Sequence, residues 1–434
     1  MNKDKTQKIV KLSISALLAG TILAFLVFFI NANTNDIKTI PPEVIIEALQ
    51  QELKVHEISK VEIGSMGDLL IHAPVIRAFY QEQDKSYNFS EAFTYLKPSI
   101  NKLDYGVIDM EGTLASENFS GYPVFRCPDS LIDAAKECGF DLFLTANNHT
   151  NDNGNYGFKR TMRVLGDKGV SFIGTRPNIE DKKYVINTIN KIKIGMVNYT
   201  YGVIDNQGIA YVNGVPLTRE NSKLINIFDY NRLNEFYKEQ ENIIEEMQNQ
   251  GVDKIVYYMH WGTEYQIKEN DWQRKIAQKL CDLGVDVIVG GHPHVVQPMD
   301  VLHSDISGKD TICIYSVGNA ISNQRRELMD LKTGHTEDGV LFKFTFSKYS
   351  DGNVIVSDVS AVPTWVNMYY KKDGKKTYQI LPLDKEKSWK EEFNLDEEMF
   401  NNASKSYERT MNIVSSGQEK ANDVVKTNIS KYKN

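Results

Sequence analysis

The sequence predicts an α/β fold in which at least some strands are parallel, and three observations lead to this prediction. From residue 61 onward, short apolar runs alternate with amphipathic segments of helical periodicity. Several of those segments end in a glycine, at Gly139, Gly251 and Gly284, and glycine is common just past the end of a helix. The chain has 434 residues, 41% of them hydrophobic, so it can bury one large core or two ordinary ones.

The apolar runs are the predicted strands, because each is short and is followed by a turn or helix signal. They cover residues 61–66, 105–110, 140–146, 170–174, 192–199, 254–259, 285–289 and 311–317. After Asn323 the pattern becomes strand-like, and residues 340–346 and 354–362 are predicted to complete the sheet. The earlier alternation of strands with helices indicates parallel pairing for much of that sheet.

The N-terminus predicts a membrane anchor. Residues 12–30 carry no charge, and a helix of that length, at ~1.5 Å per residue, spans roughly 28 Å, close to the hydrocarbon thickness of a bilayer. Four lysines precede this run, which predicts a cytoplasmic N-terminus and an extracytoplasmic main domain. A cleaved signal peptide is the alternative, but its apolar part is usually shorter and ends at small residues. The expected location is the cell membrane, crossed once.

The expected organisation has four parts. Residues 1–30 form a cytoplasmic stub and transmembrane signal-anchor helix, and residues 31–60 form a polar stalk. Residues 61–365 form the globular domain. Residues 366–434 are a charged C-terminal extension, and its part from residue 385 on is expected to be an exposed helix or a partly disordered tail, because it is poor in apolar residues.

Charge and cysteine content exclude some functions. The net charge is -7, which argues against a nucleic-acid partner, since such proteins usually carry a basic surface. The four cysteines form no CxxC pair, so a zinc ribbon is not indicated. A disulfide between Cys127 and Cys138 and small buried thiols are both compatible with the sequence.

Polar residues of catalytic or metal-binding types follow the apolar runs, where parallel strands end. They are Asp68, Asp109, Glu111, Asn147, Asn148, His149, His260, His292 and His294. In open α/β sheets, ligands bind at the carboxyl ends of the strands. Five of the eight histidines lie at or just after these positions.

Each of these residues has a plainer explanation when it is taken alone. A single histidine after a strand is commonly a loop or packing residue, and a single aspartate there is commonly a helix cap. Asn147 and Asn148 are compatible with a simple turn. In an extended segment, however, His292 and His294 would face the same side, where neutral imidazoles ligate metals. The combination therefore predicts a metal site.

Six segments carry a resemblance to a known family. They are Gly67-Asp68-Leu69-Leu70, Asp109-Met110-Glu111, Ala146-Asn147-Asn148-His149 with Asp152 and Gly154, His260-Trp261-Gly262-Thr263-Glu264-Tyr265, Gly290-Gly291-His292-Pro293-His294-Val295-Val296-Gln297-Pro298, and Tyr315-Ser316-Val317-Gly318-Asn319. In this order they resemble the metallophosphoesterase (calcineurin-like) superfamily, and within it the CapA/PgsA-type poly-γ-glutamate capsule biosynthesis family. The resemblance covers residues 61–325 and extends toward the strands near residue 360.

The resemblance implies a four-layer α-β-β-α sandwich that holds two divalent metal ions at the edge of its sheets. The implied ligands are Asp68 and His294 for the first ion, Asn148, His260 and His292 for the second, and Glu111 as the bridge. His149 would lie beside the ions as a proton donor or oxyanion stabiliser. Amide, carboxylate and imidazole ligands together suit manganese, iron or zinc.

The chain departs from the superfamily pattern at three places. Leu70 stands where most members have a histidine, and His72 follows Asp68 by four residues. An extended chain would put His72 ~13 Å from Asp68, whereas a helical turn would bring it within ~6 Å, so its role as a metal ligand stays open. The bridging residue is Glu111 in place of Asp. Thr150 follows His149 where an acidic residue is common, and Asp152 is the expected substitute.

Three functions are compatible with this pattern. The first is a part in poly-γ-glutamate-type polymer synthesis or export, together with membrane components of a polymer synthase. The second is a general surface phosphoesterase, and the third is a non-catalytic assembly scaffold, so enzyme activity is not predicted either way. Arg126 and Asn319 are the expected substrate-binding residues, since an arginine can hold the carboxylate or phosphate of an anionic polymer or phosphorylated substrate. A surface salt bridge is the alternative for Arg126.

Overall fold

The computed structural model describes residues 54–384 and 388–432. A compact unit begins at His56, so it includes the last residues of the expected stalk. Within the described ranges, no helix is both long enough and apolar enough to cross a membrane. The predicted anchor, residues 12–30, lies outside those ranges.

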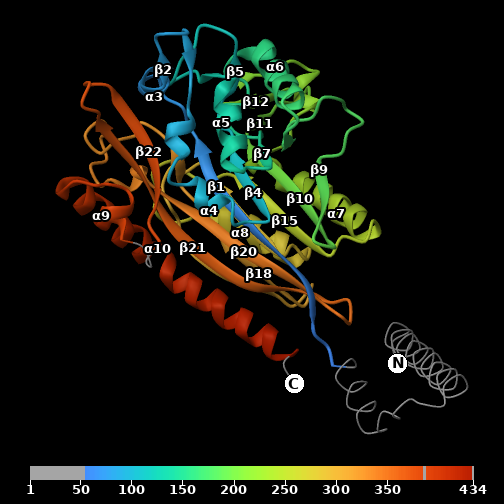
Figure 1. Ribbon diagram of the computed structural model, residues 1–434. Coiled ribbons are helices and arrows are strands. Elements are labelled where there is room, and N and C mark those ends of the chain that lie inside the picture. The colour runs from blue at the N-terminus through green and yellow to red at the C-terminus, as the bar shows by residue number, and fades with distance from the viewer. Residues whose placement is uncertain (1–53, 385–387, 433–434) are drawn as a thin grey trace, which may run out of the picture. The chain divides into compact units, whose positions relative to one another are not determined.

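The first sheet has eight strands and joins the early and late parts of the chain (Figure 1). In spatial order they are β22 (Lys376–Pro382), β21 (Val354–Tyr370), β20 (Asp338–Tyr349), β1 (Glu57–Leu69), β4 (Tyr105–Asp109), β7 (Leu142–Leu144) and β8 (Ser171–Ile173), with β19 (Asn319–Ile321) also paired to β1. Strands β19, β1, β4, β7 and β8 pair in parallel, and β20, β21 and β22 are antiparallel.

The second sheet has seven strands from the middle of the chain. In spatial order they are β14 (Ile227–Phe228), β10 (Ile192–Tyr201), β15 (Lys254–His260), β16 (Val287–Gly291), β18 (Lys309–Ile314) and β17 (Met299–Ser304), with β9 (Tyr184–Ile189) also paired to β10. Strands β14, β10, β15, β16 and β18 are parallel. All ten strands predicted from the sequence are confirmed, and their helical connections explain the parallel pairing.

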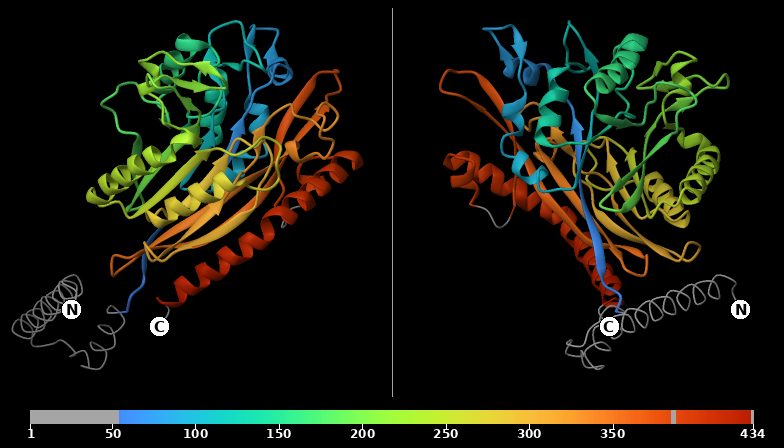
Figure 2. Two further views of the ribbon diagram at one scale, coloured as in Figure 1. Left: turned by 180° about the vertical axis from the view of Figure 1, so that it is seen from behind. Right: turned by 45° about the vertical axis from the view of Figure 1, so that its right-hand side comes forward.

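Helices cover the outer faces of both sheets. They are α3 (Ala73–Ala78), α4 (Lys97–Ile100), α5 (Ser130–Cys138), α6 (Gly154–Asp167), α7 (Leu233–Asn249), α8 (Asp271–Asp282), α9 (Trp389–Glu392) and α10 (Glu397–Ser430). Buried side chains of α3, α4 and α5 pack against the first sheet, and those of α7 and α8 pack against the second. A third apolar cluster fills the space between the sheets. The predicted four-layer α-β-β-α arrangement is therefore confirmed (Figure 2).

Short strands lie at the edge at which the parallel strands end. They are β2 (Tyr80–Gln81), β3 (Ser86–Tyr87), β5 (Thr113–Ala115), β6 (Arg126–Pro128), β11 (Val203–Ile204), β12 (Ala210–Val212) and β13 (Val215–Pro216). Cys127 and Cys138 are buried free thiols, so no disulfide joins them.

The C-terminal part differs from the expected organisation. The expected domain end at residue 365 falls inside β21, and β22 extends the same sheet beyond it. The expected exposed or disordered tail contains α10, a 34-residue helix that packs along β21 and β17 and buries seven of its residues. Figure 2 shows this helix lying across the outside of the late strands.

Candidate metal centre

The strand ends of both sheets carry the polar residues predicted from the sequence. Asp68 near the end of β1 is in register with Asp109 at the end of β4. His260 ends β15 and is in register with Gly291 of the neighbouring β16. Because these strands are parallel, their carboxyl ends lie at one edge of the sandwich.

A segment that runs from β18 to β19 passes close to both rows of strand ends. A Cβ atom on Gly67 would lie 1.8 Å from the carbonyl oxygen of Gly318. A Cβ atom on Gly290 would lie 1.9 Å from the carbonyl oxygen of Tyr315. Any larger residue at Gly67 or Gly290 would therefore push this segment away and separate the two halves of the site.

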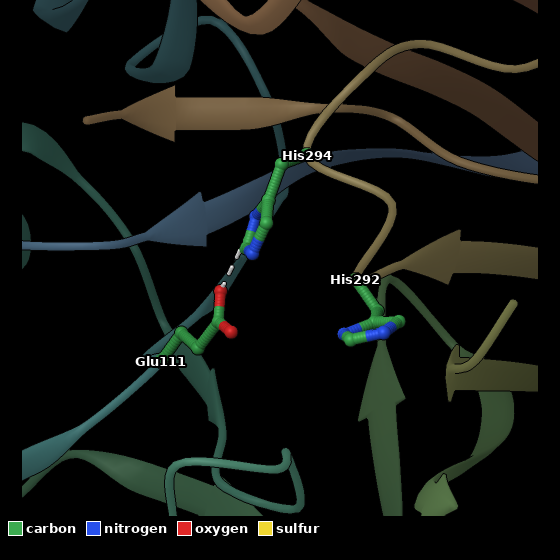
Figure 3. Close-up of side chains that lie close together, drawn as sticks. All are labelled: Glu111, His292 and His294. Carbon is green, nitrogen blue, oxygen red and sulfur yellow. Dashed lines mark ion pairs between the residues drawn. The ribbon is translucent and has the colours of Figure 1, made fainter. Parts of the chain in front are cut away.

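Glu111 lies in the middle of the site, with both carboxylate oxygens facing histidines. Its Oε2 is 3.8 Å from His294 Nδ1, and its Oε1 is 3.7 Å from His260 Nε2. Figure 3 shows Glu111 facing His292 and His294, which lie on one loop that follows β16. His294 Nδ1 is also 3.1 Å from Asp68 Oδ2. One carboxylate thus joins two groups of candidate ligands.

His260 is held between two partners. Its Nδ1 lies 3.0 Å from Asp109 Oδ2, and its Nε2 lies 2.6 Å from Asn148 Oδ1. A neutral imidazole donates from only one nitrogen. When Nδ1 donates to Asp109, the Nε2 lone pair and the Asn148 oxygen face one another, which is the geometry of two ligands directed at one cation. The Asp109 contact fixes this tautomer, as carboxylates commonly do for metal-binding histidines.

His292 and His294 converge through an unusual backbone. Both have a positive φ, 96° for His292 and 56° for His294, which is uncommon for residues other than glycine. The expectation of an extended segment is therefore wrong, although the two rings do lie together, 5.9 Å apart between centroids. Such strain typically persists at functional sites, where the surroundings hold it in place.

Four buried polar atoms in the site have no hydrogen-bond partner, and they are Asp68 Oδ1, Glu111 Oε1, Glu111 Oε2 and His292 Nδ1. Buried carboxylate oxygens without a donor are costly, because desolvation is not compensated. The potential ligand atoms of Glu111, His292 and His294 lie within 4.8 Å of one another, and so do those of Asp68, Asp109 and His260. Divalent cations would satisfy all of these atoms, so the residues fit the divalent metal ions that the family resemblance implies.

The surroundings of the site raise the pKa values of Glu111 and His294 and lower that of His292. Burial, together with the nearby Asp68 and Asp109, raises the pKa of Glu111 well above its usual value. Burial and the neighbouring histidines lower the pKa of His292 well below its usual value. Burial would also lower the pKa of His294, but its hydrogen bond to Asp68 and the charge of Asp68 outweigh burial and raise it. A neutral His292 is the form that ligates metals.

His149 lies beside the six candidate ligands and is oriented by Asp152. Its Nδ1 is 2.8 Å from Asp152 Oδ2, and its Nε2 is 3.9 Å from Glu111 Oε1. Asp152 also accepts a hydrogen bond from the backbone N–H of Phe125, which fixes the carboxylate. The acidic partner that the pattern lacks at Thr150 is thus present at Asp152, and His149 Nε2 points into the site.

The structure gives the surroundings of three further predicted site residues. His72 occupies the N-cap position of α3, and its Nδ1 lies 3.1 Å from the carbonyl oxygen of Leu70, while burial lowers its pKa to about 4. Asn319 is buried and its amide bonds His294, Ser322 and other internal groups, so it positions His294, and its contact with substrate stays a prediction. The Arg126 guanidinium forms no ion pair with any described residue. The surface salt bridge that was the alternative for Arg126 is therefore absent from the described ranges.

The sequence interpretation named Asp109 and Asn147 at the strand ends without giving them a role, and it missed Asn213. Asp109 orients His260, and Asn147 donates to Asp109 Oδ1 over 3.1 Å. Asn213 accepts a hydrogen bond from Asn148 Nδ2 over 3.1 Å, which turns Asn148 Oδ1 toward His260. The position of Asp109 two residues before Glu111, on the same strand end, was a usable signal. Asn213 lies at the tip of the β12–β13 hairpin, where Asn-Gly simply suits the turn, so nothing in the sequence distinguished it.

Comparison with known proteins places the chain in a family. Residues 62–324, more than half of the chain, match the family described as bacterial capsule synthesis protein PGA_cap. The chain belongs to this family. The membership predicted from the six sequence segments is therefore confirmed.

Two relatives of known name are both described as CapA biosynthesis proteins. The chain is 26% identical over 279 residues to "Capsule biosynthesis protein CapA" of Bacillus anthracis, a match that spans 63% of this chain but only 62% of the relative. It is 26% identical over 353 residues to "PGA biosynthesis protein CapA" of Bacillus subtilis (strain 168), spanning 79% of this chain and 83% of the relative.

Two solved structures resemble the chain more distantly. The NAD nucleotidase NadN of Haemophilus influenzae is 13% identical with a TM-score of 0.39, covering 88% of this chain and 60% of that one. The calcineurin-like phosphoesterase YfkN from Bacillus subtilis is 14% identical with a TM-score of 0.36, covering 82% of this chain and 98% of that one. At these TM-scores neither likeness bears on the chemistry of this chain.

Proposed function

We propose that this chain takes part in the synthesis or export of a poly-γ-glutamate-type capsule polymer through a site that holds two divalent metal ions. The single observation that carries the metal site is the set of unpartnered buried atoms on Asp68, Glu111 and His292. Family membership supports the link to capsule synthesis. Manganese, iron and zinc are the ions that suit this mixture of ligands.

The residues around the proposed ions have distinct tasks. Divalent ions held by these residues would supply Lewis-acid chemistry, polarising a substrate oxygen and activating a water. Asp109 holds His260 in one tautomer. The side-chain oxygen of Asn319 contacts Nδ1 of His294 and so orients that ring. His149, oriented by Asp152, can hold a proton at Nε2 for a leaving oxygen.

Metal analysis tests this proposal. The purified full-length chain, reconstituted with Mn²⁺ or Zn²⁺ and then dialysed, is expected to retain roughly two metal equivalents. His292→Ala is expected to retain one or none, because the variant removes a buried ligand, whereas His303→Ala, which removes an exposed histidine paired with Asp310, is the matched control. Equal metal content in wild type and His292→Ala by elemental analysis would contradict the proposed site.

A general phosphoesterase is the second candidate, and the His149–Asp152 pair favours it. A histidine oriented by a carboxylate and aimed at a metal site is an arrangement suited to proton donation during hydrolysis. Turnover of a chromogenic phosphodiester by the metal-loaded chain, and its loss in His149→Ala with metal content unchanged, is the result that would favour this function. Absence of turnover with two ions bound would leave polymer binding or assembly as the role of the site.

Asn213 gives a further test of the proposed ligand set. Asn213→Gly keeps a residue suited to the positive φ of 47° but removes the acceptor for Asn148 Nδ2, so the amide of Asn148 is free to turn. Metal affinity is expected to fall about 10- to 100-fold, as for other residues that orient a ligand. Asn213→Asp retains the acceptor and should retain affinity. Asn118→Gly, an exposed asparagine with a φ of 54°, is the matched control, and a metal titration that finds no difference between the two glycine variants argues against this role.

We also propose that residues 12–30 anchor the chain in the membrane, with the metal centre on the extracytoplasmic side. The uncharged run and the lysines before it support this proposal. In fractionated cells, the full-length chain should sediment with membranes and resist extraction by alkaline carbonate. Recovery of the intact chain in the soluble fraction contradicts the anchor.

A further inference from the structure

A basic groove lies on the edge of the domain that carries the metal centre. It is lined by Pro74, Arg77, Ala78, Tyr80, Glu82, Lys375 and Lys376, and it encloses a volume of about 370 Å³. One wall is α3 with the short strand β2, and the other is the turn that connects β21 to β22. Figures 1 and 2 show this turn beside α3 and β2 in each view.

The cations of the groove lack the partners that other surface cations of the chain have. Lys371 pairs with Glu91 and Lys343 pairs with Glu62. Arg77 and Lys375 are exposed, and their side chains make no ion pair or hydrogen bond within the described ranges. Lys376 lies over the ring of Tyr370, 5.4 Å from its centroid, which also leaves its charge available. Three cations thus face one carboxylate, Glu82, in a chain whose net charge is -7.

Short contacts link one wall of the groove to His72, which lies beside the metal centre. Lys376 and Tyr378 lie two residues apart on β22, roughly 7 Å, and face the same side of the sheet. The hydroxyl of Tyr378 donates to Asn323 Oδ1 over 2.6 Å, and the backbone N–H of Asn323 lies 3.3 Å from His72 Nδ1. On the other wall, α3 begins directly after His72 and carries Arg77. Both walls of the groove therefore lead back to segments that contact His72.

We propose that this groove binds a flexible polycarboxylate chain, an inference that rests on the proposed function and adds a separate binding site for its polymer. An extended polyanion with one group at the metal ions has to place its next groups elsewhere, and most of the surface would repel it because the chain is acidic. Arg77 offers the planar fork that suits a carboxylate, and the lysines offer mobile point charges. A concave wall fits a single chain better than a flat bilayer surface.

The test measures binding of a fluorescent, short γ-linked glutamate oligomer to the full-length chain. The triple variant Arg77→Gln, Lys375→Gln and Lys376→Gln is expected to bind about tenfold more weakly and with a shallower dependence on salt. The control variant Lys191→Gln, Lys223→Gln and Lys405→Gln removes the same charge from exposed positions elsewhere and is expected to bind like the wild type. Equal binding by wild type and triple variant overturns the proposal, and so does equal weakening in both variants.

Two further probes separate this proposal from others. Inorganic polyphosphate and phosphatidylglycerol vesicles are titrated against the same proteins, and tighter binding of either one that depends on the three groove cations assigns the groove to that ligand and overturns the polycarboxylate proposal. Metal content distinguishes the groove from the proposed function. A triple variant that retains both ions but loses the oligomer supports the groove, whereas His292→Ala is expected to lose metal and still bind the oligomer. If the wild-type chain binds the oligomer through the three groove cations but binds no metal, this inference stands and the proposed metal site fails.

Discussion

Replacing Glu111 by glutamine is expected to abolish binding of the two ions and, at the same time, to stabilise the metal-free protein. Glu111 is fully buried, and neither of its oxygens has a hydrogen-bond partner. Without metal it contributes an uncompensated buried carboxylate, and neutralising such a group is worth roughly 3 kcal/mol. With metal, the same carboxylate is the proposed bridge, and ligand binding at 100 times the dissociation constant contributes about 2.7 kcal/mol per site.

The two effects depend on pH in opposite ways. In the metal-free protein the pKa of Glu111 is raised by burial, so the folded state holds a proton between the usual value for glutamate and the raised value. The unfolded chain has already released that proton, so stability falls as pH rises through this window. The pKa of Asp109 is also raised by burial, so Glu111→Gln should reduce this slope without removing it. Metal binding requires the deprotonated carboxylate, so metal-dependent stabilisation of the wild type should grow as pH rises.

Thermal unfolding of wild type and Glu111→Gln, with chelator and with added Mn²⁺, measures both effects at several pH values. In chelator, the variant should unfold at the higher temperature, by the largest margin at the highest pH. In Mn²⁺ the order should reverse. A variant that is less stable than the wild type in chelator as well would mean that Glu111 has a structural partner, and the account of the site given above would then be wrong.

The sequence predicted the sheets and the site for the same physical reason. Buried parallel strands have short apolar sequences. The first polar residue after each such run lies at the carboxyl edge of the sheet, where ligands bind. The positions of Asp68, His260 and the end of β4 were therefore predicted correctly. The substrate contacts of Asn319 and Arg126 stay predictions, because no periodicity constrained where their side chains lie.

The backbone at His292 and the contact made by Asn213 could not be predicted from sequence patterns. Positive φ values at histidines come from tertiary packing, because local preferences oppose them. Asn213 follows Asn148 by 65 positions, and a residue that suits a hairpin turn gives no signal for a second role. Tertiary proximity between segments so far apart had to come from the structure.

Helix α10 was predicted as an exposed helix or a partly disordered tail, and its packing was missed because its buried face is small and weakly apolar. Its buried residues are Ala403, Ser406, Thr410, Val414, Gly417, Ala421 and Val425. They recur every three or four positions, which is a helical stripe, but few of them are strongly hydrophobic. Small residues let the helix lie close to the sheet, and a Cβ atom on Gly417 would lie 2.0 Å from the carbonyl oxygen of Met299. The helix is held by its close approach to the sheet and by polar contacts. Amino-acid composition reveals neither of these features.

The polar contact that holds α10 is centred on Asp338, and its loss is expected to be the most damaging single change outside the metal site. Asp338 is buried and accepts hydrogen bonds from Arg409 Nε over 2.8 Å, from Arg409 Nη2 over 2.7 Å and from Ser406 Oγ over 2.6 Å. Arg409→Ala would leave the carboxylate with the hydroxyl of Ser406 and with His335, whose Nδ1 lies 4.0 Å from Asp338 Oδ2. An uncompensated buried charge of this kind costs about 3–5 kcal/mol, a large fraction of the stability of an ordinary domain.

Denaturant unfolding of Arg409→Ala should therefore show a loss of about 3 kcal/mol, whereas Arg163→Ala, which removes an exposed arginine from α6, should change stability by less than about 0.5 kcal/mol. The double variant Arg409→Met with Asp338→Leu removes both charges and should recover much of the loss, which a simple cavity would not allow. The effect should also reach the metal centre, because Thr336, two residues before Asp338, accepts a hydrogen bond from the amide of Asn319, which in turn holds His294. Unchanged metal affinity in a destabilised Arg409→Ala would show that α10 supports the fold without positioning His294.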